Sequence, residues 1–249
     1  MHRFFLPPEQ CQSSSLLLTG REAHHAVRVL RLRRGDEVTV LDGAGSEIFC
    51  TVQDSGKDSV PLAVTQKNLT PQHPFQITLL QAVPKGKLLE SIIQKAVELG
   101  VPRVVPLLTE RVVTRLEGGN AANKAEKLQH LAIEAIKQCG ATWLPQIETP
   151  MSPAEFLARG EKFELPLIAS LQPGSRNARE YFQAFQTEHK RKPASVSIWV
   201  GPEGDFTADE VRMIQAGGAL PITLGRLVLR VETAATYCLS ILNYELQAA

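Results

Sequence analysis

Two glycine-bearing segments near the end of the sequence carry residue types that could bind a ligand and do chemistry. The first, residues 201–206 (GPEGDF), directly follows an apolar run at 197–200 that predicts a buried strand. The second, residues 225–232, follows another apolar run and contains an arginine and a glutamate. Glycine allows a backbone to approach a ligand closely, and open α/β sheets bind ligands in loops at the carboxyl ends of their strands. We therefore place the chemistry in these two segments.

Neither segment contains a common phosphate-binding motif. The sequence has no G-x-G-x-x-G after a predicted strand and no G-x-x-x-x-G-K-[ST], the motifs that are typical of dinucleotide-binding folds and of P-loop proteins. A nicotinamide-dependent enzyme and a P-loop NTPase are therefore disfavoured. The alternative that the glycines serve only as turns stays open for either segment taken alone.

The composition is that of a globular protein without a global signal for nucleic acid. Of 249 residues, 43% are hydrophobic and the formal net charge is +1, so an RNA-binding surface would need local clustering of basic residues. The four cysteines are widely spaced and form no C-x-x-C pair, which predicts reduced thiols in a cytoplasmic protein and no metal site. We expect neither a membrane span nor a signal peptide, because the apolar runs are too short.

The first 70 residues predict a small β-barrel. Three short runs rich in β-branched residues, at 37–41, 47–52 and 60–64, read as strands separated by turn residues. Regular short strands with turn signals between them are typical of such barrels. One helix interrupts the strands and is expected over residues 21–32.

After a proline-containing linker, the pattern changes to alternating strands and helices. Strands are predicted at 77–83, 104–108, 165–170, 197–200 and 222–224, and helices at 88–99, 123–138, 234–246 and after Ser152 and Thr207. This alternation is typical of a mostly parallel sheet covered by helices on both faces. We therefore predict an α/β domain over residues 76–249.

The expected helix of the first domain concentrates positive charge. Arg28 and Arg31 are three residues apart, which places them on one face of a helix, while Val27 and Leu30 can face the barrel. Arginine suits phosphate recognition because its guanidinium group is planar and multidentate. We expect this face to contact RNA, mainly through the RNA backbone. A solvated helix face that binds nothing is the alternative.

Several motifs of the chain are specific when taken together. The most specific are Gly201-Pro202-Glu203-Gly204, Leu224-Gly225 and Leu229-Arg230-x-Glu232-Thr233. Weaker ones lie at residues 3–5 (RFF), 25–31 (HAVRVLR), 84–86 (PKG) and 109–111 (TER). With these motifs the chain resembles, over essentially its whole length, the SPOUT methyltransferases that modify a uridine N3 in 16S ribosomal RNA of the small subunit (RsmE-type).

This resemblance implies a fold and an activity that the sequence pattern alone does not reach. It implies an N-terminal PUA-like β-barrel followed by an α/β methyltransferase domain that is tied into a trefoil knot. It further implies S-adenosylmethionine as the cofactor, the small ribosomal subunit as the substrate in ribosomal RNA processing, and a homodimer whose sites are completed at the interface. The apolar last helix, 234–246, is compatible with a dimer face and equally with an ordinary core helix.

The resemblance also implies roles for individual residues. Arg230 is the candidate to stabilise negative charge on a uracil carbonyl oxygen, and Glu232 the candidate to orient that arginine or to accept the N3 proton. A cap of the last helix is the alternative role for Glu232. The implied cofactor-binding residues are Leu171, Val200, Gly201, Gly204, Leu224, Gly225, Leu229 and Thr233. The implied RNA-binding residues are Arg3, His25, Arg28 and Arg31. Methyl transfer from a sulfonium needs no metal.

Two positions depart from the pattern of the family. Asp205 stands where a third glycine is common, which questions the need for a positive φ there. Leu227 stands where an arginine is often found, which leaves Arg230 as the remaining candidate cation. Two other functions stay open: another SPOUT RNA methyltransferase, such as a transfer-RNA ribose 2′-O-methyltransferase, and a ribosome-assembly factor that binds RNA without catalysis.

Overall fold

The computed structural model of the 249-residue chain describes residues 2–56, 58–111, 120–172 and 174–247. The chain divides into two compact units. The first unit comprises Met1–Gln72 and Ile133–Leu144, and the second comprises His73–Ala132 and Pro145–Ala249. The first unit therefore includes a segment from the middle of the chain, residues 133–144. The predicted boundaries, 1–70 and 76–249, place this segment in the second domain.

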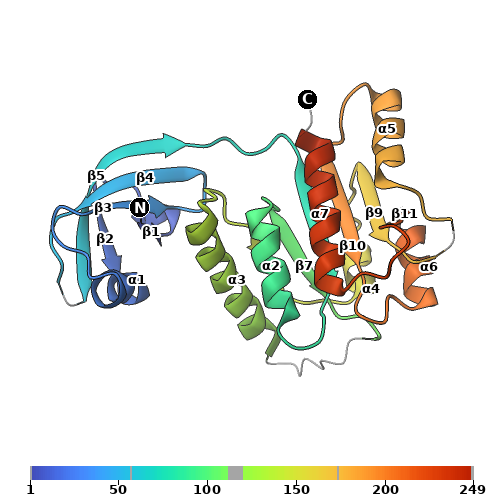
Figure 1. The fold of residues 1–249 in the computed structure, drawn as a ribbon, viewed down its shortest axis with the longest axis horizontal. Helices are drawn as coiled ribbons and strands as arrows, with labels where there is room; N and C mark the ends of the chain where they lie inside the picture. Colours follow the sequence, from blue (N-terminus) through green and yellow to red (C-terminus); the bar gives the residue numbers. More distant parts are fainter. Residues whose placement is uncertain (1, 57, 112–119, 173, 248–249) are drawn as a thin grey trace. The chain divides into compact units, whose positions relative to one another are not determined.

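The first unit is built on a five-stranded sheet in the order β1-β3-β4-β5-β2 (Figure 1). β1 pairs with β3 in parallel and the other neighbours are antiparallel. Within the described residues the edge strands β1 and β2 do not pair with each other, so the sheet is a half-barrel and not the closed barrel that we predicted. The strands are β1 (His2–Phe5), β2 (Ser15–Thr19), β3 (Glu37–Leu41), β4 (Ser46–Val52) and β5 (Ser59–Leu69).

Three of these strands were predicted, and their alternating pattern explains why they form. In β4, every second residue from Ser46 to Val52 is buried, because successive side chains of a strand point to opposite faces and one face covers the core. The predictions at 37–41, 47–52 and 60–64 are confirmed. β1 and β2 were not predicted.

The basic helix of the first unit is shorter than predicted. A 3-10 turn, η1 (Pro8–Gln10), precedes it, and the helix consists of α1 (Gly20–His24) continued by a π-helical turn, η2 (His25–Val29). Arg31 lies beyond the helix end in a left-handed conformation, with φ +55°. This residue turns the chain so that Leu32 is buried in the core. The prediction that Arg28 and Arg31 share one helix face is therefore wrong. Val27 and Leu30 pack against the core, as expected.

The middle segment of the chain joins the first unit through hydrogen bonds from side chains to backbone carbonyl oxygens. Arg3 Nη1 donates to the carbonyl oxygens of Lys137 at 3.3 Å and Gln138 at 3.0 Å, in the last turn of α3 (Asn120–Cys139). Trp143 Nε1 donates to the carbonyl oxygen of Thr70 at 2.9 Å. These partners are distant in sequence, so the linear pattern of residues could not reveal the segment's place.

The second unit contains a six-stranded sheet in which all neighbouring strands are parallel, in the order β11-β9-β10-β6-β7-β8. The parallel sheet that we predicted is confirmed. β8 was not predicted, and β11 ends at Ile222, so that Thr223 and Leu224 lie in the following loop. The strands are β6 (Gln76–Ala82), β7 (Arg103–Leu107), β8 (Gln146–Ile147), β9 (Leu165–Ala169), β10 (Ser195–Val200) and β11 (Leu220–Ile222).

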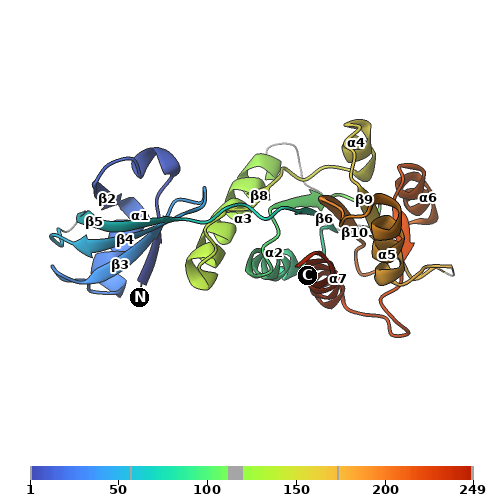
Figure 2. The same ribbon diagram turned by 90° about the horizontal axis from the view of Figure 1, so that it is seen from above.

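Helices cover both faces of this sheet (Figure 2). On one face, α7 (Val231–Gln247) packs on β6 and β10, flanked by α2 (Leu88–Glu98) and α5 (Ala178–His189). On the other face, α4 (Pro153–Ala158) and α6 (Ala208–Ala216) enclose an apolar core with Trp199 and Ile168 of the sheet. α5 was not predicted.

Local sequence signals set the starts of several helices. Ser152, Asn177 and Thr207 each form a capping box with the glutamate three residues later, at the start of α4, α5 and α6. Such boxes satisfy backbone N–H groups that the first turn leaves unpaired. The helix starts predicted at Ser152 and Thr207 are confirmed. No helix within the described ranges has the length and apolar content that crossing a bilayer requires.

Candidate functional site

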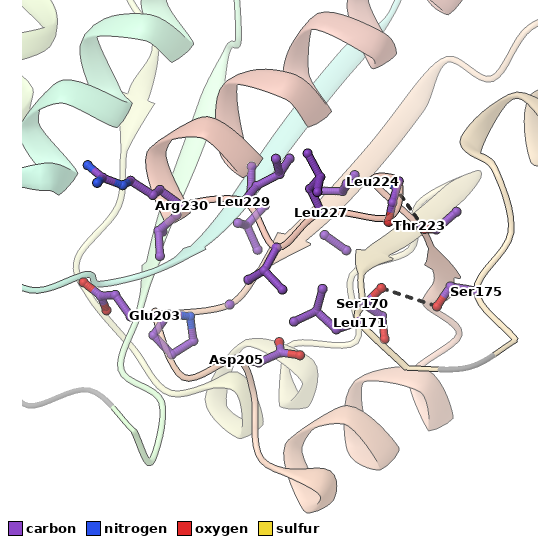
Figure 3. Close-up of a pocket in the computed structure, with 18 of the residues that line it drawn as sticks. Ser170, Leu171, Ser175, Glu203, Asp205, Thr223, Leu224, Leu227, Leu229 and Arg230 are labelled. Carbon is purple, nitrogen blue, oxygen red and sulfur yellow. Dashed lines mark hydrogen bonds between the residues drawn. The ribbon is translucent and has the colours of Figure 1, made fainter.

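A cavity of about 870 Å³ opens at the carboxyl ends of β9, β10 and β11 (Figure 3). These three strands are neighbours in the sheet, so the loops that follow them meet at one edge. The volume is in the range of sites that enclose a cofactor or another small molecule. The cavity is lined by Leu88 and by residues 169–172, 174–175, 200–203, 205, 223–232 and 234.

The structure brings most of the predicted catalytic and cofactor-binding residues together around this cavity. Two predicted residues lie elsewhere: Gly204 packs against Arg111, and Thr233 faces a separate groove between α2 and α7. The predicted residues that line the cavity are Leu171, Val200, Gly201, Leu224, Gly225, Leu229, Arg230 and Glu232.

The loop after β10 folds so tightly that Gly201 cannot carry a side chain without a shift of its neighbours. A Cβ atom on Gly201 would lie 2.8 Å from Asp205 Oδ1 and 3.2 Å from the backbone nitrogen of Phe206. Asp205 adopts a left-handed conformation with φ +60°, and its Oδ1 accepts a hydrogen bond from Phe206 N at 2.8 Å. Aspartate tolerates this conformation better than most residues. The departure from glycine at this position therefore keeps the positive φ.

The loop after β11 needs glycine for a different reason. Gly225 has φ +107°, and a Cβ atom there would meet nothing within 4 Å. The constraint is therefore the backbone conformation, because a residue with a Cβ atom adopts this positive φ only with strain. Thr223 Oγ1 accepts a hydrogen bond from Gly225 N at 3.2 Å and fixes the turn.

The loop after β9 forms the third wall and is held by its own serines. Ser170 Oγ accepts a hydrogen bond from Gln172 N at 3.1 Å, and Ser175 Oγ donates to the carbonyl oxygen of Gln172 at 2.9 Å. Leu171 lies between them and is 62% exposed. Its side chain is thus free to contact a ligand in the cavity.

Charged and apolar side chains alternate along the segment that leads into α7. Arg226 and Arg230 are exposed, and their guanidinium groups have no hydrogen-bond or ion-pair partner among the described residues. Between them, Leu227 is 77% and Val228 79% exposed. Arg226 was not predicted; its position directly after Gly225 in the second glycine-bearing segment is the signal that could have found it.

Glu203 and Glu232 differ in what their carboxylates do. Glu203 Oε1 accepts a hydrogen bond from Lys85 N at 2.9 Å, so this side chain braces two loops. The carboxylate of Glu232 has no partner among the described residues and lies in the first turn of α7. Glu232 lines both the cavity and the groove between α2 and α7, and it is therefore available to a substrate.

The four predicted RNA-binding residues, Arg3, His25, Arg28 and Arg31, differ in their surroundings. The Arg3 guanidinium is used by the carbonyl groups at the end of α3. His25 packs edge-on against Phe4, with 6.0 Å between ring centroids. Arg28 and Arg31 are both exposed, but Arg31 has left the helix. Of these two arginines, Arg28 is the one that lies on the helix.

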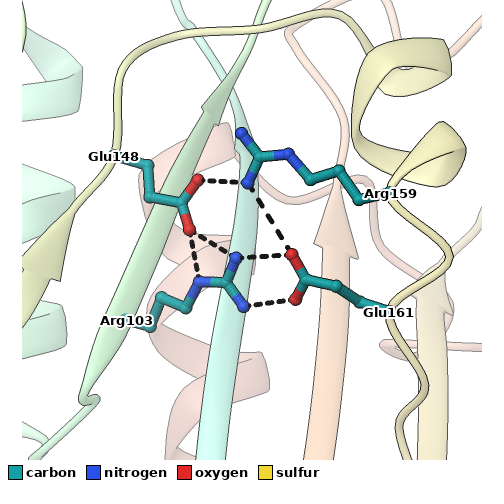
Figure 4. A network of polar contacts seen from close by, with 4 residues as sticks. All are labelled: Arg103, Glu148, Arg159 and Glu161. Carbon is teal, nitrogen blue, oxygen red and sulfur yellow. Dashed lines mark hydrogen bonds and ion pairs between the residues drawn. The ribbon is translucent and has the colours of Figure 1, made fainter.

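A network of four charged side chains, Arg103, Glu148, Arg159 and Glu161, lies near the amino end of β7 (Figure 4). The cavity lies at the carboxyl ends of the strands. Arg159 Nη1 lies 2.7 Å from Glu148 Oε2, and Arg103 Nη2 donates to Glu161 Oε1 at 2.9 Å. The Arg103 guanidinium lowers the pKa of Glu161. Every charge of this network is paired, so it ties β7 to the segments around α4 and offers no free group for chemistry. Among the described residues, no group of three or more His, Cys, Asp or Glu side chains could hold a metal ion.

Two family models match successive parts of the chain. The RNA methyltransferase domain family matches residues 71–243, and the RNA methyltransferase PUA domain family matches residues 18–64. A Synechocystis protein named ribosomal RNA small subunit methyltransferase E is 32% identical over 249 residues, which are 99% of this chain and 78% of that protein.

Two solved structures share the fold over nearly the whole chain. A putative methyltransferase from Legionella pneumophila, in complex with bound SAM, has a TM-score of 0.86 and 32% identity, and the match covers 96% of both chains. A ribosomal RNA small subunit methyltransferase E from Neisseria gonorrhoeae, bound to S-adenosylmethionine, has a TM-score of 0.83 and 26% identity, and covers 97% of this chain and 96% of its own. Together with the cofactor-sized cavity, these matches show that the chain belongs to the RsmE-type family of S-adenosylmethionine-dependent methyltransferases of small-subunit ribosomal RNA.

Proposed function

We propose that this protein methylates N3 of a uridine in 16S ribosomal RNA of the small subunit, using S-adenosylmethionine bound at the carboxyl ends of β9, β10 and β11. The observation that carries the proposal is a cavity enclosed by three loops, with the side chains of Arg230 and Glu232 in its wall, neither of which has a partner among the described residues.

The residues around the cavity fit S-adenosylmethionine. Gly201 and Gly225 present bare backbone, which allows close approach to the adenosine and methionine parts. Leu171, Leu224 and Leu229 would supply apolar surface for the adenine ring, and hydroxyl and charged side chains of the same loops would supply polar contacts. A pocket that combines apolar surface with convergent polar groups is typical of cofactor sites.

The chain's own residues would position the uracil and manage its charge. The bound cofactor supplies a methyl group on a positively charged sulfur. The N3 proton of uracil must leave, so a base or a group that stabilises the resulting anion is required. Arg230 would donate to a uracil carbonyl oxygen as negative charge builds there. Glu232, two residues away, would orient Arg230 or accept the proton.

We also propose that the protein acts as a homodimer through the face formed by α2 and α7. A groove of about 460 Å³ lies between these helices and is lined by Tyr237 of α7, which is exposed, as is Tyr244 of the same helix. Because Glu232 lines both the groove and the cavity, a partner bound at this face would help to complete the site. The family resemblance further supports a trefoil knot in the segment that contains the two glycine-bearing loops.

The first unit would grip the RNA, chiefly at Arg28 and with help from Arg31 and His25, while the second unit carries the methyltransferase chemistry. Because the planar guanidinium group of arginine suits phosphate recognition, the grip would act on the RNA backbone. The protein would act in the cytoplasm, where small ribosomal subunits are assembled.

The test is methylation of small subunits purified from a strain that lacks the gene. With the purified protein and labelled S-adenosylmethionine, we expect one methyl group per subunit, and mass mapping should place it on a uracil N3. A methyl group on a ribose oxygen or on transfer RNA would support a different SPOUT enzyme. Binding of subunits and cofactor without any transfer would mean that the protein is an assembly factor.

A further inference from the structure

The Thr109-Glu110-Arg111 motif follows β7, and none of its residues lines the cofactor cavity. Its contacts are instead with α6 and with the loop at 201–206, which does line the cavity. We infer that Glu210 and Arg111 are positioning residues that hold this loop in its cofactor-binding shape. The inference rests on the proposed function, because it takes the loop to be a cofactor wall.

Glu210 joins two segments with a single buried carboxylate. Its side chain, on α6, belongs to a residue that is only 5% exposed. Oε1 accepts a hydrogen bond from Glu110 N at 3.0 Å, and Oε2 accepts one from Thr207 N at 2.9 Å. Both carboxylate oxygens are thus required as acceptors. Glutamine cannot replace this group, because its amide nitrogen is a hydrogen-bond donor and would lie against one of the two backbone N–H donors.

Arg111 holds the loop from outside at Gly204. Its Nη1 donates to the carbonyl oxygen of Gly204, and its Cδ lies 3.4 Å from where a Cβ on Gly204 would be. A Cβ atom at Gly204 would make only an ordinary van der Waals contact with Arg111, so the hydrogen bond to the Gly204 carbonyl oxygen carries this brace.

The loop is braced a second time at the preceding residue. Glu203 Oε1 accepts from Lys85 N, so two consecutive loop residues are bound by the segments that follow β6 and β7. Gly201 stands in the same loop, and its backbone forms part of the cavity wall. A loop that is already in place spares the cofactor the cost of ordering it. Loss of a brace should therefore lower cofactor affinity before it affects the chemical step.

The experiment uses the full chain with Arg111→Ala, Arg111→Lys and a control, Arg212→Ala. Arg212 is an exposed arginine that pairs with Asp209 on α6. Calorimetry with S-adenosylhomocysteine should show a Kd about tenfold higher for Arg111→Ala, the effect of one lost hydrogen bond to a charged group. Arg111→Lys should recover part of the affinity, and the control should match wild type. At saturating cofactor the turnover of Arg111→Ala should return to within about twofold of wild type.

Two further measurements distinguish this role from others. Hydrogen exchange of the amides at 201–206 should be faster in Arg111→Ala without cofactor, and Glu210→Gln should show the same change. An unchanged Kd with weaker RNA binding in Arg111→Ala would overturn the inference and make Arg111 an RNA contact. A loss of turnover that saturating cofactor does not restore would also overturn it. If wild type itself bound no cofactor, the proposed function would fail, and the inference with it.

Discussion

Gly201→Ala tests whether tight packing of the loop after β10 shapes the cofactor cavity. The new Cβ would lie 2.8 Å from Asp205 Oδ1, a separation that forces the carboxylate to move. The movement breaks its 2.8 Å hydrogen bond with Phe206 N. One such bond contributes about 1 kcal/mol, and a remaining close contact with Phe206 N adds to the cost. We expect a total of about 1–2 kcal/mol, which lowers cofactor affinity about five- to thirtyfold.

The assay is calorimetry with S-adenosylhomocysteine on the single and double variants. Asp205→Gly in the Gly201→Ala background removes the oxygen that collides with the new Cβ, and glycine accepts the φ of +60° at this position. The double variant should therefore bind more tightly than Gly201→Ala alone. Wild-type affinity for Gly201→Ala, or a double variant that is no better than the single one, would refute the packing argument.

Three further predictions concern other parts of the chain. Gly225→Ala should lower cofactor affinity about tenfold through backbone strain at φ +107°, and Asp205→Gly should not rescue it in calorimetry. Arg28→Ala should reduce the slope of log affinity for RNA against log salt by about one, whereas Arg3→Ala should leave that slope unchanged and lower the melting temperature, because its guanidinium bonds the end of α3. The Arg191 guanidinium lowers the pKa of Glu164 from 4.5 to about 2. The ionised Glu164 therefore stabilises the fold at pH values above its ordinary pKa, and this stabilisation is lost as the pH falls toward 2. The difference in urea midpoint between wild type and Glu164→Gln should shrink between about pH 5 and pH 2.

Much of the second unit could be predicted from sequence because its signals are local. The capping boxes at Ser152 and Thr207 mark helix starts, and alternation of strands with helices indicates a parallel sheet. Since the carboxyl ends of parallel strands share one edge, Leu171, Gly201 and Gly225 could be predicted to lie around one cavity.

The rest depends on contacts between distant residues. β1 is a strand because it pairs with β3, and the segment at 133–144 joins the first unit through bonds with residues near the start of the chain. Arg31 leaves the helix because Leu32 must be buried, which periodicity does not encode. Gly204 was placed in the cavity by its motif, but the motif does not say on which side of the loop a residue faces.

The most direct test of the central claim is single-turnover methylation of small subunits by Arg230→Ala, with enzyme and cofactor at saturation. Arg230 is exposed and its guanidinium group has no partner among the described residues, so folding and cofactor affinity should stay near those of wild type. If Arg230 stabilises charge only as the uracil reacts, the rate should fall about a hundred- to a thousandfold, and Arg230→Lys should recover part of it. A rate within a few-fold of wild type would contradict the account and transfer the role to Glu232 or to a group from the partner subunit.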